Sequence, residues 1–485
     1  MLAYSFFVMK NYLSIFIVFL FPSLLLSQEF TPFYDYKSNM DDRIWDVMQM
    51  QEHPNNLVIT GTSVVGNEHR LWFYVIDQQG NVLDSIVNGG FIDHGSVYKM
   101  LDFGEKGIIG AGFVKNKNTG LNDLLLVRID TSFQMIEQSR YQLGEFNEGF
   151  IRMRKTANNE LIVYGFLVNP VDLSDYDMVF MKFSDVGQLI NQRIYDDDNL
   201  RILFDLIVKD NSDEYIAFVS ADEYLAFYTV NDNFDVVDTV ECNSFLFNLS
   251  AEWLGDKILT VSTRTEQKSN RNVYVSLFDT AANILEELSF GKPDTNEYCF
   301  NYKSIDYFDK NNIYITATSN FTVGSLYQEY DNEVLVVNLD STLTPRWEKY
   351  IGGDAYYNVF NLTALQDGGV VLACRRYDYR EQTGEMDVCL FRLDAEGNLM
   401  ASTELHPHSS GFEIYPNPVH DRLYINGLRS YRDAEVKVYN ASGQLMLQET
   451  LQTDYLNVAS LPKGFYLLKI QSEDEIFVQK FVKDK

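Results

Sequence analysis

The sequence predicts an all-β protein, a seven-bladed β-propeller followed by a small C-terminal immunoglobulin-like β-sandwich. Aromatic residues make up 14% of the 485 residues and only 10 residues are proline, a composition that favours strands. A pair of apolar strand-like runs recurs seven times at intervals of about 50 residues, as in propeller blades. After Gly411 the pattern changes to seven shorter runs, and Pro416 and Pro418 mark the start of this second unit.

The first 27 residues are predicted to be a cleaved export signal. Lys10 precedes the apolar run Leu13–Leu26, and Ser27 supplies a small residue before Gln28. The run is shorter than the roughly 20 residues of a membrane-spanning helix. We therefore expect removal of residues 1–27, with a retained membrane anchor as the alternative.

Residues 28–401 contain the repeat. Each unit has an apolar strand, a polar loop and a second strand that closes on Asp, Asn or Ser. The first strands are Asn56–Gly61, Gly107–Gly112, Glu160–Gly165, Glu214–Val219, Lys257–Ser262, Asn312–Ala317 and Gly369–Cys374. The closing residues are Asp77, Asp130, Ser184, Asn231, Asp279, Asp340 and Asp394.

Further strands flank each pair, such as Trp45–Met50 before the first pair and Asn81–Val87 after it. Four strands per unit is the number in a propeller blade. The segment Phe30–Ser38 is predicted to be an extra outer strand that completes the last blade and closes the ring. An eight-bladed ring and a β-solenoid are the alternatives.

The closing residues are predicted to shape turns. An Asp, Asn or Ser side chain accepts hydrogen bonds from backbone N–H groups two residues on. Gly80 and Gly397 then supply the positive φ that a tight hairpin needs. Recurrence at the same turn in most repeats favours this structural role over metal binding or acid catalysis. These units resemble the Asp/Gly-rich propeller repeats of bacterial secreted proteins.

Charge and motifs exclude several function classes. The formal net charge is −30, of which the segment from Gly411 onward contributes −1, so the large region should repel nucleic acid and anionic membranes. No GxSxG elbow, P-loop or dinucleotide fingerprint occurs, and no two of the six histidines have metal-type spacing. We therefore predict no catalytic, cofactor-binding or metal-binding residue. Cys374 and Cys389, on one predicted hairpin, are the best candidates for a disulfide.

The C-terminal unit carries four recognisable blocks. They are YPNP (Tyr415–Pro418), KVYNASGQLM (Lys437–Met446), LPKGFYLLKI (Leu461–Ile470) and KFVK (Lys480–Lys483). In this order they resemble the type A C-terminal sorting domain of cargo proteins of the type IX secretion system in Bacteroidetes. The resemblance covers residues 412–485, with 402–411 as a linker. Its motif positions here are Tyr415, Pro416, Asn417, Pro418, Gly443, Gly464 and Lys480.

The resemblance implies a route. A Sec signal would carry the chain to the periplasm, and the sorting domain would dock on the outer-membrane translocon. A sortase-like peptidase would then cut within the linker. The protein would be released, or attached to lipopolysaccharide at the cell surface.

Two functions follow from this organisation. We favour a non-catalytic binding or adhesion propeller for glycan or protein ligands, since propellers present loops around a central channel. The alternative is a secreted hydrolase or lyase acting on polysaccharide or peptide through the channel. Three or more converging ionisable groups with raised carboxylate pKa values would favour the enzyme. An apolar or uncharged lining would favour binding.

Overall fold

The structure is a computed structural model that describes residues 33–34, 41–400 and 413–483 apart from short gaps. Gaps of four or more residues are 88–94, 170–175, 196–200, 210–213, 243–246, 381–384, 427–433 and 441–444, and the others are one to three residues long. The predicted signal 1–27 and linker 402–411 lie outside the described residues.

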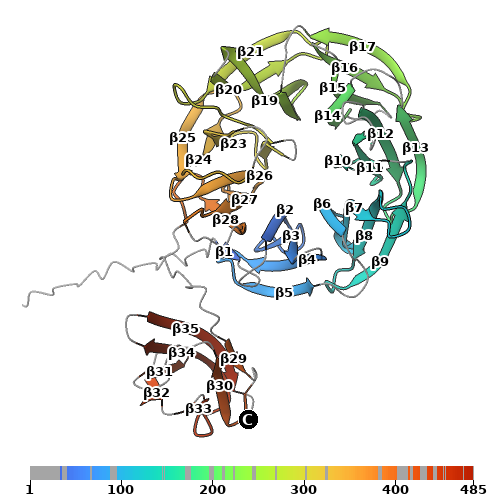
Figure 1. The fold of residues 1–485 in the computed structure, drawn as a ribbon. Coiled ribbons are helices and arrows are strands. Elements are labelled where there is room, and N and C mark those ends of the chain that lie inside the picture. The colour runs from blue at the N-terminus through green and yellow to red at the C-terminus, as the bar shows by residue number, and fades with distance from the viewer. Residues whose placement is uncertain are drawn as a thin grey trace, which may run out of the picture.

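The described residues from Phe33 to Leu393 form seven four-stranded antiparallel sheets arranged in a ring (Figure 1). The innermost strands are β2 (Asp41–Gln49), β6 (Gly95–Asp102), β10 (Glu148–Lys155), β14 (Arg201–Val208), β18 (Phe247–Leu254), β22 (Ile305–Tyr307) and β26 (Tyr356–Ala364). The second strands are β3 (Asn56–Val65), β7 (Ile108–Lys115), β11 (Leu161–Val168), β15 (Tyr215–Ala221), β19 (Lys257–Gln267), β23 (Ile313–Ser319) and β27 (Val370–Tyr377).

The third strands are β4 (Glu68–Asp77), β8 (Asn122–Ile129), β12 (Tyr176–Phe183), β16 (Tyr224–Val230), β20 (Asn270–Phe278), β24 (Glu333–Leu339) and β28 (Asp387–Leu393). The outermost strands are β5 (Val82–Val87), β9 (Met135–Tyr141), β13 (Leu189–Tyr195), β17 (Val236–Cys242), β21 (Ile284–Phe290), β25 (Pro345–Gly352) and β1 (Phe33–Tyr34). This is the β-propeller arrangement that the repeats predict.

The N-terminal strand closes the ring. In β1, Phe33 pairs with Cys389 and Tyr34 with Val388 of β28, so the first strand of the described chain completes the last sheet. The last sheet of the ring therefore combines β1 from the N-terminal side of the ring with β26–β28 from its C-terminal side. To separate the two sides, the backbone hydrogen bonds between β1 and β28 must break. The predicted closing strand is therefore confirmed at these two residues.

Burial explains why the second and third strands were the easiest to see in the sequence. Adjacent sheets pack face to face, so a strand such as β7 is buried from Ile108 to Val114. The outermost strands face solvent along much of their length, as in β21, where Ile284 and Leu285 are exposed. Strands buried on both faces read as continuous apolar runs, whereas the outer strands have a mixed pattern.

The closing residues shape the turns as predicted. Asp77 Oδ1 accepts the backbone N–H groups of Gln79 and Asn81, at 2.9 and 2.8 Å. The same pattern recurs at Asp130, Ser184, Asn231, Asp279 and Asp340. Asp394 Oδ1 accepts the N–H four residues on, that of Asn398, at 2.7 Å.

Glycine is not required in these turns, however. Gly80 has φ 80°, but the equivalent positions hold Phe133 at 56°, Phe234 at 63° and Leu343 at 57°. These three side chains are buried, so core packing offsets the strain of a left-handed backbone.

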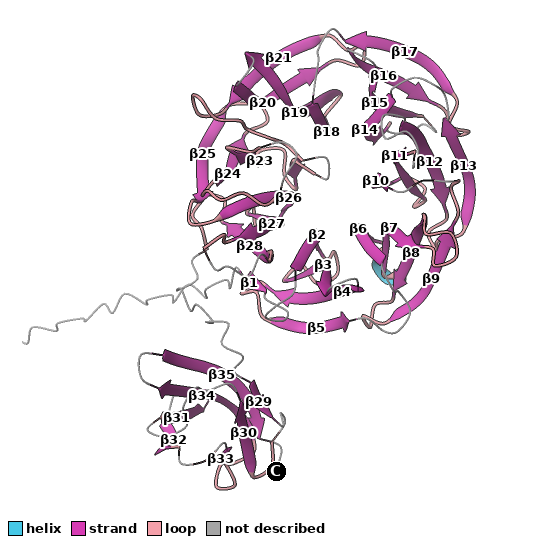
Figure 2. Ribbon diagram, viewed as in Figure 1, coloured by secondary structure: helices cyan, strands magenta, loops and turns pink. Residues whose placement is uncertain are grey.

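The C-terminal residues form two sheets around one core (Figure 2). One contains β29 (Glu413–Tyr415), β30 (Arg422–Asn426) and β33 (Tyr455–Asn457). The other has the order β32 (Leu445–Thr450), β31 (Glu435–Asn440), β34 (Gly464–Ser472) and β35 (Glu475–Lys483). The one helical element in the described residues is a 3₁₀ turn, η1 (Gly104–Lys106). Within the described part of the chain, no helix has the length and hydropathy to cross a membrane.

Candidate functional site

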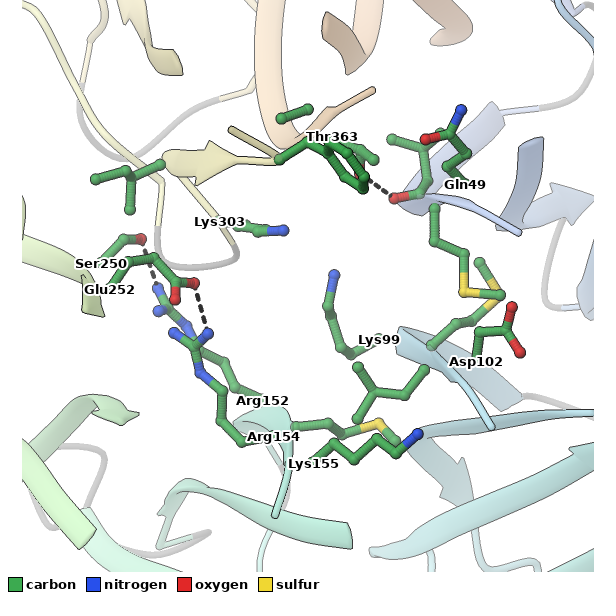
Figure 3. A pocket seen from close by; sticks show the side chains of 18 of the residues that line it. Gln49, Lys99, Asp102, Arg152, Arg154, Lys155, Ser250, Glu252, Lys303 and Thr363 are labelled. Carbon is green, nitrogen blue, oxygen red and sulfur yellow. Dashed lines mark hydrogen bonds and ion pairs between the residues drawn. The ribbon is translucent and has the colours of Figure 1, made fainter. Parts of the chain in front are cut away.

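A cavity of about 440 Å³ lies among the innermost strands (Figure 3). All seven sheets of the ring contribute to its lining. One lining residue from each, in chain order, is Gln49, Lys99, Arg152, Asp205, Ser250, Ile305 and Thr363. A single cavity therefore gathers side chains that lie about 50 residues apart in sequence.

Register shifts re-aim polar side chains at or next to this cavity, since Lys99 and Asp205 line it and Asp46 hydrogen bonds to Lys99. The pairing of four innermost strands skips one aromatic residue and resumes at the polar residue that follows it. These steps are Trp45-Asp46, Tyr98-Lys99, Phe204-Asp205 and Phe360-Asn361. An extra residue in one strand re-aims its neighbours. The aromatic–polar dipeptides are thus the sequence signal of the site, which the strand pattern alone did not reveal.

Two clusters of ionisable residues adjoin the cavity. We call Arg152, Arg154, Asp205 and Glu252 the arginine cluster, and Asp46, Lys99, Lys303 and Asp306 the lysine cluster. Both join innermost strands of different sheets.

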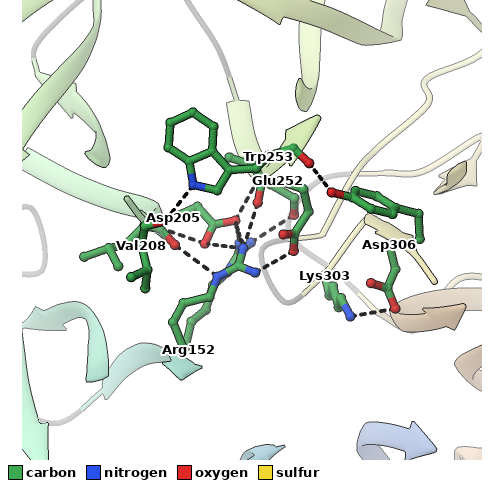
Figure 4. Close-up of polar contacts among 12 residues, drawn as sticks. Arg152, Asp205, Val208, Glu252, Trp253, Lys303 and Asp306 are labelled. Atoms are coloured by element: carbon green, nitrogen blue, oxygen red, sulfur yellow. Dashed lines mark hydrogen bonds and ion pairs between the residues drawn. The ribbon is translucent and has the colours of Figure 1, made fainter. Parts of the chain in front are cut away.

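In the arginine cluster Asp205 is fully buried and surrounded by donors (Figure 4). Its carboxylate pairs with Arg152 and, at 3.4 Å, with Arg154. It also accepts the Tyr164 hydroxyl at 2.6 Å and the Ala251 N–H at 2.8 Å. Burial opposes ionisation, but the two guanidinium groups outweigh it and lower the pKa of Asp205. This carboxylate therefore stays ionised and is unsuited to donating a proton.

The guanidinium groups of Arg152 and Arg154 also donate hydrogen bonds to other acceptors of the protein. Arg154 donates to Glu252 at 2.5 Å and to the carbonyls of Leu206 and Ala251 at 3.0 and 2.7 Å. Arg152 donates to the carbonyl of Leu249 at 3.1 Å. A guanidinium has five N–H donors in a fixed plane, which suits it to join several strands at once.

In the lysine cluster Asp46 is equivalent to Asp205, because each directly follows the register shift in the innermost strand of its sheet. Its Oδ1 accepts Lys99 Nζ at 2.8 Å and Asn361 Nδ2 at 2.5 Å, and its Oδ2 accepts the N–H of Met100 at 2.7 Å. Burial raises the pKa of Asp46, because the single ammonium of Lys99 offsets less of the desolvation than the two guanidinium groups do at Asp205. Burial also lowers the pKa of Lys99.

Lys303 completes the cluster. It pairs with Asp306 at 2.8 Å, and Asp306 accepts the N–H of Ala364 at 2.9 Å. The ammonium groups of Lys303 and Lys99 both extend into the cavity (Figure 3). Their charges are close enough for Lys303 to contribute, after burial, to the lowered pKa of Lys99.

An exposed aromatic ring stands beside the cavity. Phe308, in the turn between β22 and β23, is 60% exposed and lines the cavity. It also lines a neighbouring hollow of about 240 Å³ with Asn312, Tyr314 and Gln366. The cavity and the hollow thus share Phe308, Ala364 and Gln366 in their linings.

The sorting-motif positions predicted from the sequence are placed in part. Tyr415 lies in β29 opposite Tyr424, and Gly464 begins β34. Lys480 lies in β35 opposite Leu467. The remaining positions lie outside the described residues and are Pro416, Asn417, Pro418 and Gly443.

The cysteines are buried and unlinked. Cys374 and Cys389 face each other directly in β27 and β28, as expected for a hairpin, and both are free thiols. Burial raises the pKa of both, so neither is an activated nucleophile. No group of three or more His, Cys, Asp or Glu side chains in the described residues is arranged to hold a metal ion.

The C-terminal unit has a family assignment. Residues 413–484 match the model of the secretion system C-terminal sorting domain. The chain ends in a type IX sorting domain. The predicted type IX sorting domain is therefore confirmed over residues 413–484, and it indicates export to the cell surface or secretion.

Several solved structures are similar to the chain. The β-propeller domain of the trilobed protease from Pyrococcus furiosus is 10% identical, over 75% of this chain and 97% of its own, with a TM-score of 0.43. PorZ, a surface component of the type IX secretion system of Porphyromonas gingivalis, is 10% identical over 91% and 81%, with a TM-score of 0.31. A protein of unknown function from Bacteroides caccae is 9% identical over 61% and 94%, with a TM-score of 0.37. No curated protein matches the chain.

Proposed function

We propose that this protein is a binding or adhesion protein of the cell surface, with its ligand site in the central cavity of a seven-bladed propeller. The proposal rests on the contacts of the carboxylates and ammonium groups at the cavity. Each carboxylate is held by cations or backbone N–H groups, whereas the ammonium groups of Lys99 and Lys303 point into the cavity.

The carboxylates support binding over hydrolysis. Glycoside hydrolysis needs one carboxyl group as an acid and a second as a base or nucleophile, both able to reach the scissile bond. Asp205 is held ionised by arginine, and Glu252 pairs with Arg154. Asp46 is fully buried with both oxygens hydrogen bonded, and Asp102 accepts two backbone N–H groups.

One observation favours the second candidate, a hydrolase or lyase. The raised pKa of Asp46 and the lowered pKa of Lys99 form the kind of perturbed pair that clusters at catalytic sites. Only Lys99 of this pair lines the cavity, so if the protein is an enzyme, Lys99 would exchange the proton with the ligand and Asp46 would hold Lys99 in place.

The domain plan and the export route belong to the same proposal. We assign residues 1–27 to a Sec signal, 28–401 to the propeller, 402–411 to a linker and 412–485 to an immunoglobulin-like sorting domain. The motif residues around Tyr415, Gly464 and Lys480 would form a recognition surface for the translocon in the outer membrane of a member of the Bacteroidetes. A sortase-like peptidase would cut in the linker, leading to release or to lipopolysaccharide attachment.

A paired assay tests the proposed function. The purified protein is applied to an array of glycans and peptides, and each ligand that it retains is then incubated with it and weighed by mass spectrometry. We expect retention with the ligand intact. Shortened or unsaturated products that vanish in the Asp46→Asn variant would establish the enzyme instead.

A further inference from the structure

Resting on this proposed site, we propose that the ligand is an acidic saccharide. Its carboxylate lies between the ammonium groups of Lys99 and Lys303, and a neighbouring sugar ring lies on Phe308. The inference combines the charge of the cavity, the direction of the two lysines and the exposed aromatic ring.

The lining of the cavity has more basic than acidic residues, unlike the chain as a whole. The chain has 69 acidic and 39 basic residues. Among the residues that line the cavity, five are basic and three are acidic: Lys99, Arg152, Arg154, Lys155 and Lys303 against Asp102, Asp205 and Glu252. The carboxylates of Asp46 and Asp306 pair with Lys99 and Lys303 but do not line the cavity, so the surface that a ligand would meet is richer in cations than the rest of this acidic protein.

The ammonium groups of Lys99 and Lys303 have further N–H donors for a ligand. An ammonium has three N–H donors. The carboxylate of Asp46 accepts one from Lys99, and that of Asp306 accepts one from Lys303. Both ammonium groups enter the cavity from different sheets (Figure 3). An anion between them would bridge the two and relieve their mutual repulsion.

The surroundings fit a sugar. Phe308 has the highest exposed fraction among the exposed large hydrophobic side chains of the described residues. Most of the others, such as Leu285, lie on the outermost strands, whereas Phe308 lies at the cavity. Sugar rings present an apolar C–H face to aromatic rings, and their hydroxyl groups hydrogen bond to polar side chains, amides among them. Gln51 and Gln366 line the same cavity.

The test uses tetragalacturonate as the probe. Binding to the full chain is measured by calorimetry at low and physiological salt, beside neutral galactotetraose and tetraglutamate. The variants are Lys303→Gln and Phe308→Ala. Their matched controls are Lys310→Gln, an exposed lysine in the turn between β22 and β23 that does not line the cavity, and Leu285→Ala on β21.

We expect tetragalacturonate to bind and both peptide and neutral sugar to bind more weakly. Lys303→Gln and Phe308→Ala should each weaken binding about tenfold, the scale of one lost contact at a binding site, and salt should weaken it further. The two controls should bind as the unaltered protein does.

Three results would overturn the inference. Equal binding of galactotetraose would show that the carboxylate is not recognised, although a sugar-binding function would stand. Equal binding of tetraglutamate with no effect of Phe308→Ala would replace the saccharide with an acidic peptide. If no probe bound, the proposal that the ligand is an acidic saccharide would be wrong. The binding function itself is tested separately, by the array of glycans and peptides.

Discussion

The arginine cluster and the lysine cluster occupy equivalent places in the ring but have different chemistry. In both, a buried aspartate follows a register shift and accepts a backbone N–H from the next sheet, Met100 for Asp46 and Ala251 for Asp205. Two arginines lower the pKa of Asp205, whereas burial raises the pKa of Asp46 beside a single lysine. The contrast shows that aspartates at one architectural position, each joining several innermost strands, can have pKa shifts of opposite sign, set by the number of cations around them.

The largest effect should come from Asp205→Asn. The substitution leaves Arg152, which is almost fully buried, without its carboxylate, and this costs about 3–5 kcal/mol of unfolding free energy. Denaturant unfolding measures the loss, and Asp256→Asn at an exposed turn is the control. A loss below about 1 kcal/mol would mean that the arginine cluster does not join the sheets.

Asp46→Asn should cost less, about 1–2 kcal/mol. Burial raises the pKa of Asp46, so its carboxylate contributes less stabilisation than that of Asp205 and its replacement by a neutral amide loses less. The same denaturant titration compares the two variants. If Asp46→Asn destabilised the protein as much as Asp205→Asn, the proposed difference between the clusters would be wrong.

The pH dependence of the two clusters should have opposite signs. The pKa of Asp205 lies below its ordinary 3.8, so its stabilisation is present above that value and is lost as the pH falls through the lowered pKa. The pKa of Asp46 is raised, so stability is lost instead as the pH rises from 3.8 through the raised value.

Melting temperatures between about pH 2 and 6 check this contrast. In Asp205→Asn the melting temperature should fall less as the pH is lowered below 3.8. In Asp46→Asn it should fall less as the pH is raised above 3.8. Parallel profiles for both variants would contradict the assigned pKa directions.

The smallest effect on stability should come from Lys303→Gln. The Lys303 and Asp306 side chains are 22% and 19% exposed, so their pair should contribute under about 0.5 kcal/mol. Denaturant unfolding of Lys303→Gln beside Lys310→Gln measures it. A large loss of stability would make Lys303 a structural residue like the arginines.

Much of the fold could be predicted from the sequence because the second and third strands are buried on both faces. The closing residues also report their turns directly, since Asp77 and its equivalents bond to backbone two and four residues on. Left-handed Phe133 and Phe234 could not be foreseen, because the core contacts that offset their strain come from distant strands.

The site was harder to predict for the same reason. Asp46 and Asp205 sit inside apolar strands, and their partners lie about 50 residues or more away in sequence. The signal was present as an aromatic residue before a polar one, as in Trp45-Asp46 and Phe204-Asp205. Only the register shifts in the structure give that dipeptide its meaning.

A crystal structure of the protein with tetragalacturonate tests the central claim most directly. We predict an intact ligand in the central cavity, with one carboxylate within hydrogen-bonding distance of both Lys99 and Lys303 and a sugar ring against Phe308. A cleaved ligand in the cavity, or an intact ligand bound to the outermost strands, would contradict it.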